Sequence, residues 1–357
     1  MERGDQRQDE PLRSRGDYRE PETGRPKYWQ SIEESPALLA ELELVPSGSN
    51  VLEIGSAGGH MTRALIAHGC RVTAIERDAE SGRAARQVCD RVLIADVEEM
   101  DFEQALGKEL YDIILLGDVL EHLVQPEKLL GTLRRFVMPN GSLVVSLPNV
   151  AHASVRLALL GGRFEYRPWG LLDATHLRFF TRASMRAMFE RSGWVISDVK
   201  DIEIQPLDWE VEWDPLEITS SVLRRLSRDA DAFTYQFVFR AVPQGRRALN
   251  EPRNPADEMR RAAWNVQRVR RQLAQFLVRR AVRRRRGGGE TRAAIALLWK
   301  AFLLSSQLKT LGWLVVVSLP PRVCNRIDKG MGGGGVRGRA VDGVRQQTER
   351  GSPEDRK

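Results

Sequence analysis

The sequence predicts an α/β fold built on a doubly wound, mostly parallel sheet of seven strands. Short β-branched runs alternate with helix-sized segments between residues 28 and 243, and the first run leads through a loop of small residues into a helix. Such alternation is typical of parallel sheets covered by helices on both faces. No clear crossover helix separates the last two runs, so we expect the sheet to finish with an antiparallel strand.

The predicted elements follow one another in chain order. The strands are expected at Asn50–Ile54, Arg71–Glu76, Arg91–Ala95, Tyr111–Gly117, Ser142–Leu147, Trp194–Ile204 and Phe233–Ala241. The helical segments between the first five strands include Met61–His68, Glu80–Asp90 and Pro126–Phe136. A later helix is predicted over 181–192, with Thr181 as its N-cap.

Composition separates the chain into segments of different character. With 42% hydrophobic and 29% charged residues among 357, the chain is neither collagen-like, nor a disulfide scaffold, nor wholly disordered. We expect a disordered leader over 1–26, a folded domain over 27–243, a linker over 244–258, a helical basic and apolar extension over 259–320 and a disordered tail over 321–357.

The positive charge is concentrated in the extension. Residues 260–286 contain eleven arginines and no other charged residue, so the formal net charge of +7 leaves 7 − 11 = −4 for the remainder. Arginines followed by a tryptophan-bearing apolar stretch favour peripheral binding of residues 260–319 to an anionic membrane surface. Nucleic-acid binding is a weaker alternative. A solvated helix, or packing of 292–319 on the domain or a partner, also stays open.

Several features bear on the compartment. The three cysteines form no C-x-x-C pair, so neither a disulfide framework nor a metal site is predicted. The N-terminus lacks the apolar stretch of a signal peptide, and the apolar run Thr310–Pro321 is too short to cross a bilayer. We expect a cytoplasmic protein, held peripherally at the inner membrane face if the extension binds lipid.

The loop after the first strand predicts a ligand site. Small residues let a ligand approach the backbone, and the helix that follows offers free N–H groups. A dinucleotide fingerprint starting at Gly55 would need glycine at positions occupied by Ala57 and His60, and the chain has no Walker lysine here. Glu53 just before the loop suits a cationic ligand, whereas a tight turn without a ligand is the alternative.

Four segments resemble, in order, the motifs of class I S-adenosylmethionine-dependent methyltransferases. Val51–Gly59 is similar to the first motif: Glu53 matches its acid, Gly55 and Gly59 match its outer glycines, and Ala57 replaces the middle one. The other three segments are Arg71–Glu76, Ile94–Val97 and Tyr111–Leu123.

The resemblance, which covers about 60% of the chain, implies a Rossmann-like fold and S-adenosyl-L-methionine as the cofactor. It implies that Glu76 binds the ribose hydroxyls, because a carboxylate is a bidentate acceptor for a vicinal diol. It also implies that Asp96 accepts from the adenine amino group while Val97 packs on the ring, and Asp118 joins the cofactor residues at the exit of the fourth strand. The match is closest to a bacterial branch that includes the ubiquinone-pathway O-methyltransferases and enzymes associated with glycosyltransferases.

Histidine is the side chain best suited to accept a hydroxyl proton near neutral pH. His152 follows the fifth strand and His176 lies in a polar loop before the helix at 181–192, so we predict both as catalytic residues. Capping or ion pairing is the alternative for His176. His122, after the fourth strand, is equally suited to holding its turn, and His68 is expected to end the first helix.

These features predict methyl transfer to a hydroxyl of a small-molecule or saccharide acceptor. The Asn/Asp-Pro-Pro-aromatic motif of nucleic-acid N-methyltransferases is missing, since Gly117 and Asp118 occupy its place. The alternatives are a non-catalytic methyltransferase-like binding module and an RNA methyltransferase that uses the arginine-rich tail, with a nicotinamide-dependent oxidoreductase ranked last.

Overall fold

The computed structural model describes residues 35–89, 91–203, 211, 220–226 and 228–245, together with five single positions further on. The chain divides into two compact units, 1–269 and 270–357. In the second unit the described residues are all helical, and they are Ala274, Leu277, Val278, Ala281 and Trp299. The predicted leader and tail, and most of the linker and of the extension, lie outside the described residues.

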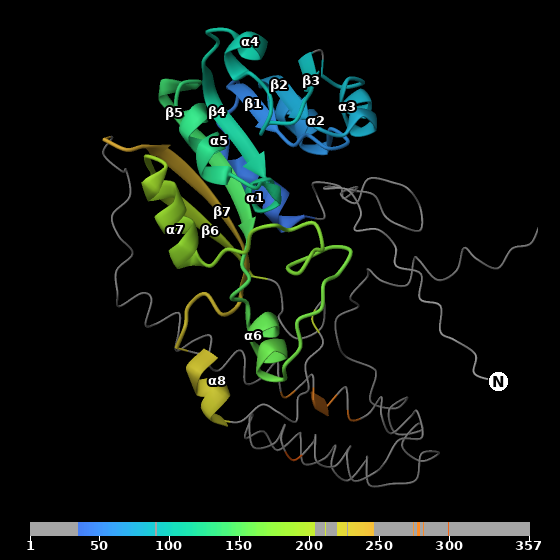
Figure 1. The fold of residues 1–357 in the computed structure, drawn as a ribbon, viewed down its shortest axis with the longest axis vertical. Helices are drawn as coiled ribbons and strands as arrows, with labels where there is room; N and C mark the ends of the chain where they lie inside the picture. The colour runs from blue at the N-terminus through green and yellow to red at the C-terminus, as the bar shows by residue number, and fades with distance from the viewer. Residues whose placement is uncertain are drawn as a thin grey trace, which may run out of the picture. The chain divides into compact units, whose positions relative to one another are not determined.

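A seven-stranded sheet with the order β3-β2-β1-β4-β5-β7-β6 forms the centre of the first unit (Figure 1). Its strands are β1 (Asn50–Ile54), β2 (Arg71–Glu76), β3 (Arg91–Ile94), β4 (Tyr111–Gly117), β5 (Val137–Pro148), β6 (Trp194–Glu203) and β7 (Thr234–Pro243). The first five are mutually parallel, and β7 is antiparallel to both β5 and β6. The predicted doubly wound sheet with an antiparallel finish is confirmed.

The helices alternate with the strands as expected. They are α1 (Pro36–Leu44), α2 (His60–Ala67), α3 (Ala79–Ala85), α4 (Phe102–Leu106), the 3-10 helix η2 (Leu120–His122), α5 (Pro126–Leu133), α6 (Ala153–Leu160), α7 (Arg182–Arg191) and α8 (Ser220–Leu226). Thr181 caps α7 as predicted, in a reciprocal capping box with Ser184. None of the helices among the described residues is long and apolar enough to cross a membrane.

Hydrophobic side chains are buried on both faces of the central strands, as expected for a parallel sheet. In β1, Leu52 and Ile54 join the core that α4, α5 and α7 cover, whereas Val51 joins the core beneath α1 and α2. Neighbours in β4 divide in the same way, with Ile114 in the first core and Ile113 in the second. The helix layers fix the strands on both sides (Figure 1).

The strand order reverses between β1 and β4. From β1 the chain proceeds outward through β2 and β3, then returns to build β4 and β5 on the other side. In open α/β sheets, ligands bind beyond the carboxyl ends of the strands at such a reversal. The glycine loop leaves β1 at this point, and the exit of β4 lies beside it.

Candidate active site

The loop after β1 has three positions with left-handed backbone geometry. Gly55 has φ +79°, and a Cβ there would come within 2.7 Å of Val119 Cγ2. Gly59 has φ +80° and begins α2. Ala57 has φ +44°, which is strained for an L-residue, and its N–H donates to Glu76 Oε2 at 2.8 Å. Ala57, which replaces the middle glycine of the motif, therefore links the loop to the end of β2 by a hydrogen bond.

Two of the predicted cofactor acids lie at the ends of β1 and β2. Glu53 is buried and accepts a 2.6 Å hydrogen bond from Thr62 Oγ1, and burial raises its pKa to about 7. Glu76 is also buried, and burial raises its pKa. Besides the bond from Ala57, it accepts one from the Asp78 N–H at 2.8 Å through Oε1. Each Glu76 oxygen keeps a second lone pair for a ligand.

The segment after β3 holds Asp96 and Val97 as predicted. Asp96 Oδ1 accepts from the Glu98 N–H at 2.9 Å, and Oδ2 lies 3.7 Å from Arg77 Nη1. The Asp96 side chain is about one-third exposed (29%), so one edge is open to a ligand. Val97 is half-buried against the main core.

Asp118 leaves β4 with φ +51°. Its Oδ1 accepts hydrogen bonds from Ser146 Oγ at 2.9 Å and from Gln236 Nε2 at 2.5 Å. Burial raises its pKa, and these two donors oppose the rise. Ser146 lies on β5 and Gln236 on β7, so the antiparallel finish of the sheet holds this acid in place.

Two buried acids that the sequence analysis did not select flank Asp118. Glu41 on α1 and Glu121 on η2 are 1% and 0% exposed, and in the described part of the chain their carboxylate oxygens accept no hydrogen bond of good geometry. The neighbouring donors are the Ser146 hydroxyl for Glu41 and the backbone of Glu121 itself. Burial, followed by the charge of Asp118, raises the pKa of Glu41 to about 8 and that of Glu121 well above its usual range. Buried acids with so few donors indicate a site for a cation or a proton donor.

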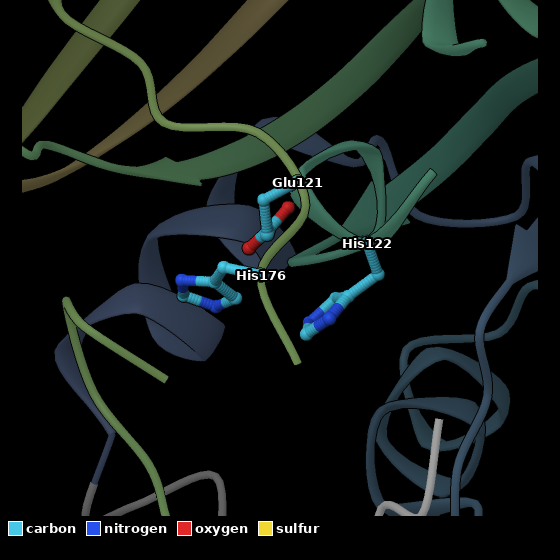
Figure 2. Close-up of side chains that lie close together, drawn as sticks. All are labelled: Glu121, His122 and His176. Atoms are coloured by element: carbon cyan, nitrogen blue, oxygen red, sulfur yellow. The ribbon is translucent and has the colours of Figure 1, made fainter. Parts of the chain in front are cut away.

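Glu121 belongs to a cluster with His122 and His176, whose side chains lie close together in Figure 2. One oxygen or nitrogen atom from each of the three residues lies within 4.8 Å of the others. The imidazole rings meet edge to face, with centroids 4.8 Å apart. Burial, with His176 as the next cause, lowers the pKa of His122 to about 4, so this ring is neutral at pH 7.

The Glu121–His122–His176 cluster has the donor set of a divalent-metal site. A carboxylate oxygen and two imidazole nitrogens suit transition metals, and imidazole must be neutral to ligate, as His122 is. A metal held there would occupy the imidazole nitrogens, so metal ligation and proton acceptance by His176 are alternatives. No metal site was predicted from the sequence, in which 54 positions separate the two histidines.

The two histidines predicted as catalytic have different surroundings. His176 lies in the buried cluster beside Glu121. His152 is the N-cap of α6, where its Nδ1 lies 2.8 Å from Ser154 Oγ, and its ring contacts that of Tyr235. The environment of His176 therefore suits proton transfer better than that of His152. His68 ends α2 as expected.

A row of aromatic rings leads from the surface to His176. Tyr166, which is 59% exposed, contacts Phe164 with ring centroids 5.6 Å apart, and Phe164 contacts Phe179 at 5.9 Å. Phe179 in turn lies 6.1 Å from the His176 ring. The segment 161–180 thus joins an exposed aromatic surface to the buried histidines.

A doubly wound sheet with this order, a glycine loop after β1 and acids at successive strand ends define a class I methyltransferase fold. A family model described as a methyltransferase domain matches residues 27–199. The chain is 30% identical over 173 residues (46% of this chain, 70% of the relative) to a ubiquinone biosynthesis O-methyltransferase of Xanthomonas axonopodis pv. citri (strain 306). A second enzyme of that name, from Aeromonas salmonicida (strain A449), is 25% identical over 165 residues (45% and 68%).

The chain belongs to the class I S-adenosylmethionine-dependent methyltransferase family, and it is an enzyme whose cofactor is S-adenosyl-L-methionine. The site fits that cofactor, because the loop leaves no room for a Cβ at Gly55 and the buried carboxyl groups at the strand ends suit a cationic ligand. A solved S-adenosylmethionine-dependent methyltransferase from Archaeoglobus fulgidus is similar over 60% of this chain and 96% of that one, with a TM-score of 0.43 and 17% identity.

Proposed function

We propose that this enzyme transfers the methyl group to a hydroxyl of a small-molecule or saccharide acceptor. The observation that carries the proposal is the buried cluster of Glu121, His122 and His176 beside Asp118 at the exit of β4. A hydroxyl must lose its proton during transfer, and a neutral imidazole beside a carboxylate is suited to accept it. The names of the two O-methyltransferase relatives support the same choice of acceptor atom.

The cofactor residues are proposed to act in the order of their strands. Glu76 would hold the ribose hydroxyls with the lone pairs left after its two backbone N–H bonds. Asp96 would bind the adenine amino group, with Val97 against the ring. Glu53, Asp118 and the 55–59 loop would then surround the methionine end, beyond β1 and β4.

S-adenosyl-L-methionine supplies a methyl group on a positively charged sulfur, and the leaving thioether is neutral. The protein must therefore align the acceptor oxygen with the methyl carbon and remove one proton. The bound cofactor would supply the methyl group to the acceptor oxygen and leave as the neutral thioether, and the His176 imidazole would accept the hydroxyl proton. Glu121 lies in the same cluster, and the positive charge of the resulting imidazolium would favour ionisation of its carboxyl group.

The exposed rings of segment 161–180 are proposed to bind the body of the acceptor. Aromatic side chains beside polar groups are typical of sites for ring-containing small molecules and sugars. Phe164 and Tyr166 alternate with Arg163 and Glu165, which adds hydrogen-bonding groups to the apolar surface. An acceptor that packs on these rings would extend along Phe179 toward His176.

Formation of S-adenosylhomocysteine tests the proposed reaction. Purified enzyme is incubated with cofactor and fractions of cell extract, and Asp96→Ala serves as the inactive comparison. His176→Gln should lower turnover at least about tenfold while leaving the cofactor dissociation constant unchanged, whereas His68→Gln, at the far end of α2, should change neither. Lack of turnover with every hydroxyl-containing fraction would favour the binding-module alternative.

The location of the enzyme is proposed as cytoplasmic, with peripheral attachment to the inner membrane face through residues 260–319. Support comes from the eleven arginines of 260–286 and the tryptophans at 299 and 313. Liposome sedimentation of the whole chain and of a chain lacking 259–357 tests this attachment. Equal sedimentation of the two on anionic vesicles would contradict it.

A further inference from the structure

We propose that Glu41 binds the positively charged sulfonium of S-adenosyl-L-methionine and thereby favours the cofactor over its neutral product, S-adenosylhomocysteine. Glu41 lies on α1, outside the motifs that define the cofactor site. The assignment rests on the proposed placement of the cofactor along the strand ends. Glu41 would be a residue by which the enzyme discriminates between S-adenosylmethionine and S-adenosylhomocysteine.

The first observation is that the Glu41 carboxylate is buried and that its neighbouring donor, the Ser146 hydroxyl, donates to Asp118. The other acids at the strand ends are satisfied: Glu53 by Thr62, Glu76 by two backbone N–H groups, and Asp118 by two side chains. Glu41 is 1% exposed, and among the described residues neither of its oxygens accepts a hydrogen bond of good geometry. A buried charge in this condition is unfavourable unless a ligand completes it.

The second observation is the position of Glu41 at the reversal of the strand order. A Cβ on Gly117, the last residue of β4, would come within 2.9 Å of Glu41 Oε1 and 3.1 Å of Oε2. The absence of a side chain at Gly117 therefore lets the carboxylate reach the strand exit. α1 thus places Glu41 at the exit of β4, where doubly wound folds bind ligands.

The third observation is the sign of the surrounding charge. The charged groups that act on Glu41 are Asp118 and Glu53, and Glu41 in turn acts on Glu121. Two basic side chains bond to the end of α1 but are not among the groups that act on Glu41. Arg240 donates through Nη2 to the Leu44 carbonyl, and its buried Nε has no partner among the described residues, whereas Lys200 pairs with Glu43. The ligand that fits this environment is a cation.

The order of chemical groups along the cofactor indicates that the sulfonium is the part that lies beside Glu41. With adenine beyond β3 and ribose at β2, the sulfur comes next, near β1 and β4. The methyl group must face the Glu121–His122–His176 cluster, and Glu41 lies close enough to Glu121 to affect its ionisation. The sulfur that carries the methyl group is therefore the cationic centre expected beside Glu41.

The test compares two ligands that differ mainly in charge at sulfur. Isothermal titration calorimetry measures the dissociation constants of S-adenosylmethionine and S-adenosylhomocysteine for the whole chain and for Glu41→Gln. We expect Glu41→Gln to weaken cofactor binding roughly ten- to a hundredfold and product binding less than about threefold, because only the cofactor carries the sulfonium charge. Glu43→Gln is the matched control, since Glu43 is an exposed acid on the same helix.

Gly117→Ala gives an independent variant that keeps the carboxylate but displaces it. We expect it to weaken binding of the cofactor more than that of the product, by a smaller factor than Glu41→Gln. Equal losses for both ligands would assign Glu41 to the shared methionine ammonium or to packing, and no loss in either variant would also overturn the proposal. Neither titration contains an acceptor, so failure here is distinct from failure of O-methylation.

Discussion

Replacing Glu41 with glutamine should stabilise the cofactor-free enzyme at pH 8.5. Glutamine has nearly the same shape as the buried carboxyl and never ionises. Burial, reinforced by Asp118, raises the pKa of Glu41 from 4.5 to about 8, so ionisation in the folded state is unfavourable. The substitution removes that ionisation and leaves the packing of α1 unchanged.

The sign and size of the effect follow from the two pKa values. Between pH 4.5 and about 8 the folded protein retains a proton on Glu41 that the unfolded chain releases, so the free energy of unfolding falls as the pH rises through this window. A folded-state pKa of about 8 corresponds to an upper limit of about 5 kcal/mol lost by pH 8.5. The contribution is fully present below pH 4.5 and absent above pH 8.

Urea unfolding without cofactor, at pH 5 and pH 8.5, measures this difference. Wild type and Glu41→Gln should have similar stabilities at pH 5, whereas Glu41→Gln should be more stable by several kcal/mol at pH 8.5. Glu43→Gln should follow wild type at both values, because Glu43 is exposed. A Glu41→Gln variant that loses stability at pH 8.5 would refute the reasoning, since it would mean that the carboxylate is ionised and stabilised by a partner.

Three further substitutions test the rest of the site. Gly59→Ala should lower the unfolding free energy by about 1–3 kcal/mol in urea, because φ is +80° and a Cβ would lie 3.1 Å from Ala85 Cα; an unchanged midpoint would contradict this. Glu76→Gln should reduce the rise in melting temperature on adding S-adenosylmethionine, and an undiminished rise would argue against ribose binding. Zn²⁺ titration followed by calorimetry should show binding that His176→Gln weakens at least about tenfold, and equal binding by the two proteins would argue against ligation by the cluster.

The fold and the cofactor acids could be predicted because their signals are local in the sequence. A β-branched run that ends in an acid and a small-residue loop specifies Glu53 and Gly55 within a few residues. Asp118 was expected from the resemblance of Tyr111–Leu123 to a family motif, but its donor Gln236 was not, because 118 positions separate them. The pairing of β5 with β7 brings them together, and no short segment contains that information.

Glu41 was missed for a different reason. Acids alternate with leucines in α1, where Glu41 is buried and Glu43 is exposed, and nothing in the local sequence distinguishes the two. Only the packing of α1 over the exit of β4 does so. His122 and His176 were each noticed in the sequence, but their contact depends on how the segment 161–180 folds back over η2.

The buried acids connect recognition with stability. A site that binds a sulfonium in a dry environment must hold carboxyl groups that destabilise the empty fold when they ionise. Among the described residues, Glu41 and Glu121 are buried acids that accept no hydrogen bond of good geometry. A cationic ligand offsets this destabilisation, because its positive charge pairs with the ionised carboxyl groups. Stabilisation by S-adenosylmethionine should therefore exceed that by S-adenosylhomocysteine, and the difference should shrink when Glu41 can no longer carry a charge.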